Sequence, residues 1–399
     1  MPGPLNGVRI IDLTTAVLGP LTTQLLGDLG ADVIKVESPE GDSMRYLGAC
    51  RNPGMSALFL TNNRNKRSIV LDLKRPKARD ALYRLARTSD VFFHNMRPGA
   101  AERLEIDYAR LAQENPSIIY ASASGYRRDG PHANKPAFDD VIQGWSGIPD
   151  LFMKTGKEAQ YVPFAAADKV VGYVAASAIG MALFHRERTG EGQEIHVPML
   201  ETMVAFNLHE HLWGGVFDPP MGPVGYSRMA TPHRRPFQTR DGYICVMPVT
   251  DAQWNRLLIA FERPDLAADE KFVTMSQRGN NFDALYGHVG EELKKRTTAQ
   301  WQELLESRDV PCGPASSLED LLTDEYFEEQ GFFQRFDHPT EGRLVATAQP
   351  IYFSRANEED RPRLPQPRLG EHTHAILEEL GLQAGEIDEV VGREDENAS

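Results

Sequence analysis

The chain has 399 residues, a length that suits two or three domains. Hydrophobic residues make up 41% and charged residues 25%, which excludes a disordered or fibrous chain. Acidic residues outnumber Lys and Arg by 57 to 43, which argues against a general nucleic-acid or membrane-surface binder. No apolar run approaches the ~20 residues of a membrane span, and no secretory signal is visible. We therefore expect a cytoplasmic protein.

Short apolar runs alternate with helical patterns in the N-terminal part of the chain. The runs predict strands at residues 8–13, 32–37, 68–73, 90–94, 117–122 and 194–197. Helices are predicted between them, at residues 20–29, 76–86 and 98–104. Short crossover helices require parallel strands. The pattern predicts an α/β fold: a Rossmann-like large domain whose parallel sheet binds ligands at the carboxyl ends of its strands.

The rest of the chain indicates a second domain. We predict a large domain from residues 1–205, a Gly- and Pro-rich linker at 206–235, and a smaller α+β domain at 236–325. Residues 326–399 are predicted as a second linker and a C-terminal part that completes the large domain. A helix at 170–186 carries many small residues, so another element should pack closely against it. The acidic tail at 393–399 is predicted to be disordered.

Common nucleotide and hydrolase motifs are absent, and so are metal-ligand patterns. The sequence contains no G-x-G-x-x-G after a strand, no P-loop and no G-x-S-x-G. The pairs His209 with His211 and His372 with His374 lack the i, i+4 spacing of a helical zinc site. They are interpreted as exposed polar histidines, and the three cysteines have no paired spacing. We predict neither a metal nor a permanently bound cofactor.

A basic cluster stands out on this acidic chain. It comprises Arg64, Lys66, Arg67, Lys74 and Arg75, followed after the next strand by Arg97 and Arg103. Because parallel strands end at one edge of a sheet, these charges could converge there on a phosphorylated ligand. A solvated surface would produce the same pattern.

Asp168 is the candidate catalytic residue. It follows three alanines and precedes the helix rich in small residues. An aspartate here can simply cap the helix, but a cap and a nucleophile are compatible. The helix dipole would keep the carboxylate ionised, as a nucleophile must be, and free amides could stabilise an oxyanion.

The chain resembles the class III CoA-transferase family, which includes formyl-CoA transferase and α-methylacyl-CoA racemase. The resemblance lies in residues 4–13, 26–37, 65–69, 95–99, 124–126, 189–193, 310–314 and 369–373. It implies an interlocked homodimer with long linkers and a substrate that is a coenzyme A thioester. It also implies that Asp168 forms a mixed anhydride with the acyl group and then an aspartyl-CoA thioester, after which a carboxylic acid accepts the CoA.

The resemblance also implies a set of CoA contacts. These are Val17, Leu18, Leu71, Asp72, Leu73, Lys74, Asn95, Met96, Arg97, Arg103, Pro136, Ala137, Phe138 and Asp139. Position 17 is a glutamine in formyl-CoA transferase, so Val17 disfavours formyl-CoA and oxalate as substrates.

The racemase branch is the alternative function. Racemases in this family pair the aspartate with a histidine, and the histidine position is Phe138 here. Because a phenyl ring cannot accept a proton, we favour the transferase. Arg234 and Arg235 could bind a second carboxylate, which would suit a dicarboxylate such as succinate.

Overall fold

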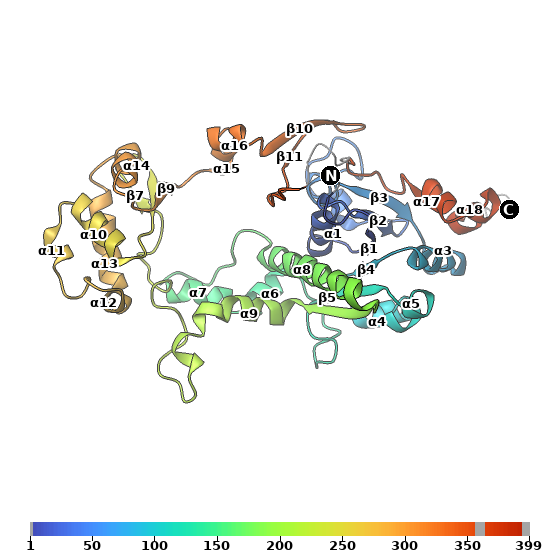
Figure 1. Cartoon of the computed structure of the whole chain (residues 1–399), viewed down its shortest axis with the longest axis horizontal. Helices are drawn as coiled ribbons and strands as arrows, with labels where there is room; N and C mark the ends of the chain where they lie inside the picture. Colours follow the sequence, from blue (N-terminus) through green and yellow to red (C-terminus); the bar gives the residue numbers. More distant parts are fainter. Residues whose placement is uncertain (1–2, 356–363, 393–399) are drawn as a thin grey trace. The chain divides into compact units, whose positions relative to one another are not determined.

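The computed structural model describes residues 3–355 and 364–392 (Figure 1). The chain forms two compact units. The large unit takes the residues up to Ser146, Val162–Val204 and the residues from Gly331. The small unit takes Gly147–Tyr161 and Ala205–Gln330. The predicted tail at 393–399 and part of the proline-rich stretch at 361–367 lie outside the described residues.

A six-stranded parallel sheet forms the centre of the large unit and confirms the predicted α/β fold. Its strands are β1 (Arg9–Leu13), β2 (Asp32–Glu37), β3 (Lys66–Val70), β4 (Val91–His94), β5 (Ile119–Ser124) and β6 (Gln193–Pro198). The order β3-β2-β1-β4-β5-β6 is that of a doubly wound sheet, and every neighbouring pair is parallel. The order reverses between β1 and β4, where such folds open a crevice for ligands.

Helices cover both faces of this sheet. The large unit contains α1 (Leu18–Asp28), η1 (Ser43–Tyr46), α2 (Ala57–Asn62), α3 (Pro76–Arg87), α4 (Pro98–Arg103), α5 (Tyr108–Glu114), α6 (Asp139–Trp145), α8 (Ala166–Thr189), α17 (Thr373–Glu379) and α18 (Ala384–Val391), while α9 (Met199–His211) follows β6. The C-terminal helices return to the N-terminal part of the chain, where α18 packs on α3 (Figure 1). There they share one apolar core with the sheet, which includes Ile11, Ile34, Leu82, Tyr120 and Ile376.

Two of the differences between predicted and observed element boundaries concern the candidate site. The strand predicted at 68–73 is β3 at Lys66–Val70. Leu71 and Leu73 are buried beyond its end, and buried leucines outside a sheet give the same apolar signal as a strand. The helix predicted at 170–186 is α8 at Ala166–Thr189, so Asp168 lies inside its first turn.

Ion pairs are buried on the sheet face opposite the apolar core. Lys66 Nζ lies 3.1 Å from Asp12 Oδ2, and Lys35 Nζ lies 3.1 Å from Asp42 Oδ2. All four side chains have 0% exposure. Since isolated charges cannot be buried at this depth, each of these groups needs its partners.

The buried pairs hold the loop that follows β1. Asp12 Oδ1 accepts a hydrogen bond from Thr14 N, and Lys35 Nζ donates one to Thr14 O. Asp42 Oδ1 accepts a hydrogen bond from the amide of Ala16, 3.2 Å away. Ala16 has a φ of +68°, a left-handed conformation that a residue with a side chain adopts at some cost. The ion pairs thus fix the backbone at the switch point of the sheet.

The small unit combines helices with a short antiparallel sheet. Its helices are α7 (Ile148–Lys154), η2 (Trp213–Val216), α10 (Asp251–Ala260), α11 (Pro264–Ala267), α12 (Met275–Gly279), α13 (Phe282–Leu293), α14 (Thr298–Glu306), α15 (Leu318–Leu321) and α16 (Glu325–Glu329). Strands β7 (Phe237–Gln238), β8 (Tyr243–Val246) and β9 (Cys312–Pro314) pair in that order. Trp254, Leu257 and Trp301 belong to a separate apolar core. A hairpin of β10 (Phe333–His338) and β11 (Gly342–Thr347) belongs to the large unit.

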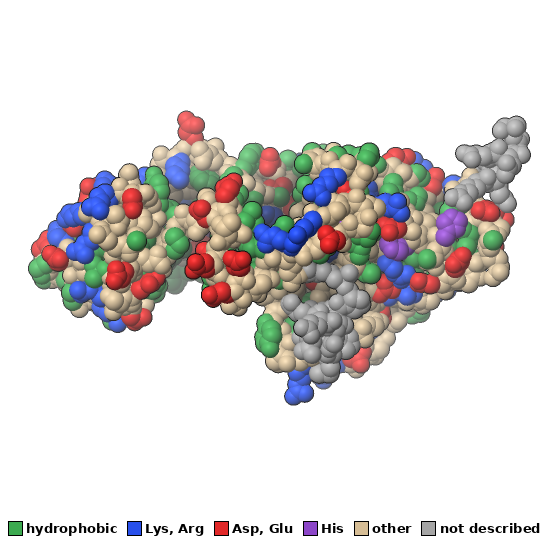
Figure 2. Space-filling model, turned by 90° about the horizontal axis from the view of Figure 1, so that it is seen from above, with side chains coloured by type: hydrophobic (Ala, Val, Ile, Leu, Met, Phe, Trp, Pro, Cys, Tyr) green, Lys and Arg blue, Asp and Glu red, His purple; other side chains and the backbone are tan. Residues whose placement is uncertain are grey.

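Charges of both signs are interspersed on the face shown in Figure 2, with no continuous basic area.

Among the described helices, α8 alone has the length and hydropathy of a candidate membrane span. In the large unit this helix contacts α1, α6 and β5.

We predict that Lys66→Met destabilises the large unit. The substitution leaves the Asp12 carboxylate buried without its main counter-charge, which typically costs about 3–5 kcal/mol. The matched control is Lys74→Met, because Lys74 is exposed and its removal should change the free energy of unfolding by less than about 0.5 kcal/mol. Urea denaturation followed by circular dichroism measures both values. Similar effects of the two substitutions would contradict the prediction.

Candidate functional site

Two loops meet at the switch point between β1 and β4. Asn95, directly after β4, uses its whole side-chain amide on the loop after β1. Its Oδ1 accepts from Thr15 N at 3.0 Å, and its Nδ2 donates to Thr15 O at 2.8 Å. The next amide, Met96 N, donates to Nδ1 of the buried His94. The predicted CoA contacts Asn95 and Met96 therefore lie in a part of the sheet edge that hydrogen bonds hold in place.

Helix α8 begins next to this edge. The hydroxyl of Thr22 in α1 donates to Gly172 O at 3.0 Å, and a Cβ on Gly172 would lie 3.0 Å from Leu18 O. The close packing expected for the small residues of this helix is therefore confirmed, with α1 as the partner. Because Gly172 lies one helical turn after Asp168, this contact brings the start of α8 towards Leu18, a predicted CoA contact.

Asp168 is not the cap of its helix. The N-cap residue is Ala165, which makes no side-chain capping bond. Instead, the amide of Asp168 donates to Asp139 Oδ1, 2.9 Å away. Asp139 begins α6, so a carboxylate from a neighbouring helix satisfies one of the free amides of α8. The helix keeps the amides of Ala166 and Ala167 in its first turn, which have no acceptor within the helix itself.

Gln143 ties Asp139 to the segment that leads into α8. It is fully buried, and its Nε2 donates to Asp139 Oδ2 at 2.5 Å and to Phe164 O at 3.1 Å. Its Oε1 accepts from Val162 N at 3.0 Å. One amide side chain thus fixes α6, the carboxylate of Asp139 and the backbone ahead of Asp168. Both oxygens of Asp139 are occupied, so a CoA contact by this residue stays a prediction.

Burial raises the pKa of Asp168 to about 7, and the negative charge of Asp139 adds to this effect. The sequence argument expected the helix dipole to keep this carboxylate fully ionised, and that expectation is wrong. A helix N-terminus contributes only about 0.3–1 kcal/mol at an ordinary site. Desolvation together with a second carboxylate outweighs it. Asp168 is therefore divided between its acid and its ionised form near neutral pH.

The basic cluster divides into engaged and exposed members. Arg64 pairs with Asp28, Lys66 with Asp12, Arg67 with Asp32 and Glu379, while Arg75 donates to the carbonyls of Glu389 and Val390. The fold uses these four charges internally, so the hypothesis of a phosphorylated ligand at this cluster rests on its other three members. Lys74, Arg97 and Arg103 are exposed and make no ion pair within the described residues.

The remaining predicted contacts lie at two places in the large unit. Asp72 lines a cavity of about 210 Å³ together with Arg75, Gly370 and His374. In the segment 136–138, Ala137 lies against the backbone of Gly125, where an added Cβ would be 2.2 Å from Ala137 Cβ. Phe138 is the N-cap of α6, and its side chain is 74% exposed.

The histidines give no support to the alternative function or to a metal site. His132, six residues before Phe138, is the histidine nearest in sequence to the position of the racemase base. Its ring packs against Tyr126 and Trp145, with centroid distances of 5.8 Å and 5.1 Å. The expectation that His211 is exposed is wrong: the residue is buried, and its Nδ1 accepts a hydrogen bond from Tyr226 N. Among the described residues, no group of three or more His, Cys, Asp or Glu side chains could hold a metal ion.

The profile of CoA-transferase family III matches residues 5–373. The chain belongs to this family. It is 32% identical over 387 residues to a probable fatty acyl-CoA transferase of Mycobacterium tuberculosis, covering 94% of this chain and 97% of that one. The family resemblance of the sequence is confirmed, and the chain is an enzyme of the CoA-transferase class.

Other family members carry names that specify acids. The chain is 32% identical to the mouse succinyl-CoA:glutarate CoA-transferase, over 94% of this chain and 86% of the relative. It is 36% identical to the acetyl-CoA:oxalate CoA-transferase of Acetobacter aceti, over 78% and 80%. Crystal structures of the M. tuberculosis protein and of a CAIB/BAIF family protein from Brucella suis match with TM-scores of 0.79 and 0.76, at 30% and 33% identity. They cover 94% and 95% of this chain and 99% and 100% of theirs.

Sequence reasoning missed Gln143 in this CoA-transferase. A single glutamine in a helix has no sequence signature, and its role depends on two backbone groups, at Val162 and Phe164, that lie 19 and 21 residues further along the chain. The one signal available was the short distance in sequence between the 136–139 motif and Asp168.

We predict that Asp168→Asn stabilises the protein at pH 8. A carboxyl whose folded pKa lies above its unfolded value of 3.8 costs stability as pH rises from about 4 through 7. Asparagine removes this cost, which we place on the order of 1–2 kcal/mol after allowing for the partial solvent exposure of Asp168. The difference between variant and wild type, measured by thermal unfolding, should shrink at pH 4. A difference independent of pH would argue against the raised pKa.

Proposed function

We propose that Asp168 is the nucleophile that carries CoA from an acyl-CoA donor to a free carboxylic acid. Its carboxylate oxygen attacks the thioester carbonyl, the C–S bond breaks, and the CoA thiolate leaves a mixed aspartyl anhydride. The thiolate then attacks the aspartyl carbonyl and releases the donor's carboxylate, which leaves an aspartyl-CoA thioester. The acceptor acid reverses these two steps and leaves with the CoA, so that Asp168 is regenerated.

The position of Asp168 is the observation that supports this role. A partly buried carboxylate stands in the first turn of α8, and α8 packs at Gly172 against the first residue of α1 at the switch point of the sheet. The first-turn amides of Ala166 and Ala167 could donate to the oxyanion that forms at the attacked carbonyl. A partly desolvated carboxylate is also a stronger nucleophile than a hydrated one.

We propose that CoA lies along the carboxyl edge of the sheet. Lys74, Arg97 and Arg103 are the exposed cations there and suit the phosphates. The proposed apolar and backbone contacts are Val17, Leu18, Leu71, Asp72, Leu73, Asn95, Met96 and the segment 136–139. The CoA thioester is a substrate in this proposal, and no permanent cofactor takes part.

We propose a dicarboxylic acid as one of the two acids. Relatives named for succinate, glutarate, mesaconate and oxalate support this class. The oxalate enzyme keeps oxalate among the acids to be tested, although Val17 disfavoured it. No described feature favours the racemase alternative, because Phe138 occupies the position of the base. A matrix of acyl-CoA donors and acids, with products identified by mass spectrometry, would name the pair.

We predict that hydroxylamine traps the acyl-enzyme at Asp168. During turnover with an acyl-CoA, hydroxylamine should convert this side chain to a hydroxamate that peptide mass spectrometry locates. Asp168→Asn should lower kcat by at least about 10³-fold, since it removes the nucleophile. The matched control is Asp140→Asn, an exposed aspartate at the start of α6, which should keep activity near the wild-type value.

The pH dependence supplies a second readout of the same prediction. Because only the ionised carboxylate attacks, kcat/KM should rise with pH through about 7. Asp139→Asn should move this inflection to lower pH, since it removes a neighbouring negative charge. Unmodified Asp168 during normal turnover would refute the mechanism.

We propose that the enzyme works in the cytoplasm as an interlocked homodimer. An exposed apolar stripe on α8 is the observation that supports a dimer. Its members Tyr173, Met181 and Phe184 are 50%, 64% and 64% exposed. They lie at helical spacing on one face of a 24-residue helix, and an exposed apolar face of this kind is typical of an interface. A second copy of the chain would cover it.

We predict that a charged residue in this stripe weakens the dimer. Phe184→Asp should shift the sedimentation coefficient of a micromolar sample towards that of the 44.6 kDa chain, because a carboxylate cannot be buried there unpaired. Gln113→Asp, at an exposed position of α5 outside this stripe, serves as the control for an added charge. A monomeric wild-type protein would contradict the proposal.

A further inference from the structure

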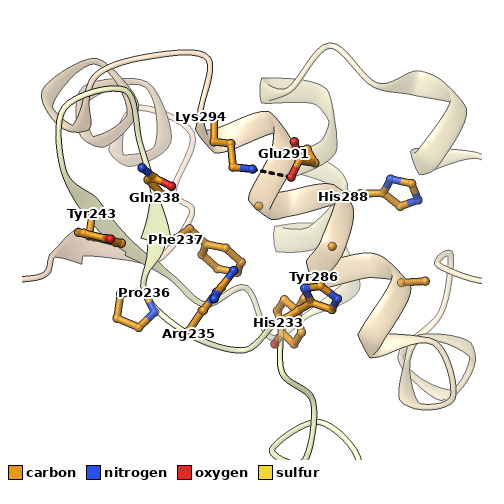
Figure 3. A pocket seen from close by; sticks show the side chains of 13 residues that line it. His233, Arg235, Pro236, Phe237, Gln238, Tyr243, Tyr286, His288, Glu291 and Lys294 are labelled. Carbon is orange, nitrogen blue, oxygen red and sulfur yellow. Dashed lines mark hydrogen bonds and ion pairs between the residues drawn. The ribbon is translucent and has the colours of Figure 1, made fainter. Parts of the chain in front are cut away.

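A cavity of about 570 Å³ lies in the small unit, between the strands β7 and β8 and helix α13 (Figure 3). Residues from the segment before β7 and from one face of α13 line it. Its volume lies within the range of small-molecule sites. Neither the proposed nucleophile nor the proposed CoA contacts belong to it, so the chemistry of Asp168 leaves it unexplained.

Two glycines of α13 form one wall of the cavity. Gly287 and Gly290 lie in the interior of this helix and line the space. A glycine there costs roughly 1 kcal/mol of helix stability relative to alanine. A Cβ added to Gly287 would meet no atom within 4 Å, and one added to Gly290 would meet Phe237 at an ordinary 3.7 Å. Packing within the unit therefore does not require these glycines, and the bare helix surface leaves room for another molecule.

Arg235 brings an uncompensated positive charge to the cavity. The ammonium of Lys294 is paired with Glu291 at 2.6 Å, and His233 lies 3.9 Å from Asp283. Arg235 makes no hydrogen bond or ion pair in the part of the chain that the structure describes, and in Figure 3 it projects from the segment before β7 towards α13. A guanidinium fork matches the geometry of a carboxylate. Its neighbour Arg234 does not line the cavity.

The wall beside Arg235 is aromatic. Phe237 and Tyr286 are 5% and 2% exposed, with ring centroids 6.1 Å apart. The hydroxyl of Tyr286 accepts a hydrogen bond from Arg228 Nε at 2.8 Å, and its ring is packed in the core of the small unit. Phe237 and the surface of α13 are therefore left to make the apolar contact. The cavity thus combines an apolar wall, a bare helix surface and a guanidinium, that of Arg235, which has no partner among the described residues.

We propose that this cavity binds a carboxylic acid with an apolar body. The carboxylate pairs with Arg235, and the body lies against Phe237 and the surface of α13 at Gly287. The guanidinium of Arg235 selects a carboxylate, and the apolar wall selects a hydrocarbon or aryl group over a polar chain. The proposal stands apart from the acyl-transfer role of Asp168, since it concerns binding to the small unit alone.

Calorimetric titration of the full chain with 3-phenylpropionate tests the proposal. Arg235→Gln should weaken binding at this site at least about tenfold, as expected for a lost charge-assisted pair. Gly287→Leu should abolish it by filling the space. Arg234→Gln, the matched control outside the cavity, should stay within about twofold of wild type, as charges without a direct contact contribute little. The uncharged 3-phenylpropanamide should bind much more weakly than the acid.

The melting temperatures of the variants separate an effect on folding from an effect on binding. Alanine or leucine at position 287 improves helix propensity over glycine, so the melting temperature of both variants should not fall. Gly287→Ala adds one methyl group and should retain binding. Should Gly287→Leu fail to fold, the comparison of Arg235→Gln with Arg234→Gln decides alone. Equal affinity of those two variants, binding of the amide as tight as that of the acid, or wild-type affinity in a folded Gly287→Leu would overturn the proposal. If the acid bound only near Asp168, Arg235→Gln and Arg234→Gln would have equal affinity, and a folded Gly287→Leu would bind like the wild type.

Discussion

The large unit depends on charges buried beneath its ligand-binding edge. Asp12, Lys66, Lys35 and Asp42 have no exposure to solvent, and burying such charges is tolerable only where opposite charges lie beside them. The same groups bond the backbone at Thr14 and Ala16. A purely apolar layer would be cheaper to bury, but it could not hold a left-handed alanine at the turn after β1. The ion pairs therefore fix the conformation of the loop at the switch point.

Two carboxylates, Asp139 and Asp168, lie together at the start of α8. Unlike the buried ion pairs, these two groups repel each other when both are ionised. Asp139 holds the amide of Asp168 and at the same time disfavours the charge of that side chain. One residue thus positions its neighbour and raises its pKa. Gln143 makes this arrangement rigid, because its buried amide would lose several hydrogen bonds if α6 moved. Partial protonation lowers the fraction of enzyme that is ready to attack. The carboxylate that does attack is less strongly hydrated and therefore more nucleophilic.

Basic residues show how a fold divides similar side chains between tasks. Arg64, Arg67 and Arg75 bond within the large unit, whereas Lys74, Arg97 and Arg103 stay exposed near the ends of parallel strands. In the small unit, Arg235 lines a cavity while Arg234 does not. Side-chain type alone does not separate these groups. In the large unit, what separates them is whether an acid or a carbonyl lies within hydrogen-bond reach.

The alternation of apolar runs was enough to predict the parallel sheet and most of its helices, because the periods of strands and helices follow from backbone geometry. Family-specific blocks in the sequence were enough to identify a CoA-transferase. The tertiary structure decided the rest. It showed that Asp168 lies within the first turn rather than at the cap, that desolvation outweighs the helix dipole there, and that Gln143 connects α6 to the segment before α8. Burial and long-range hydrogen bonds arise between segments far apart in the chain, and no local pattern encodes them.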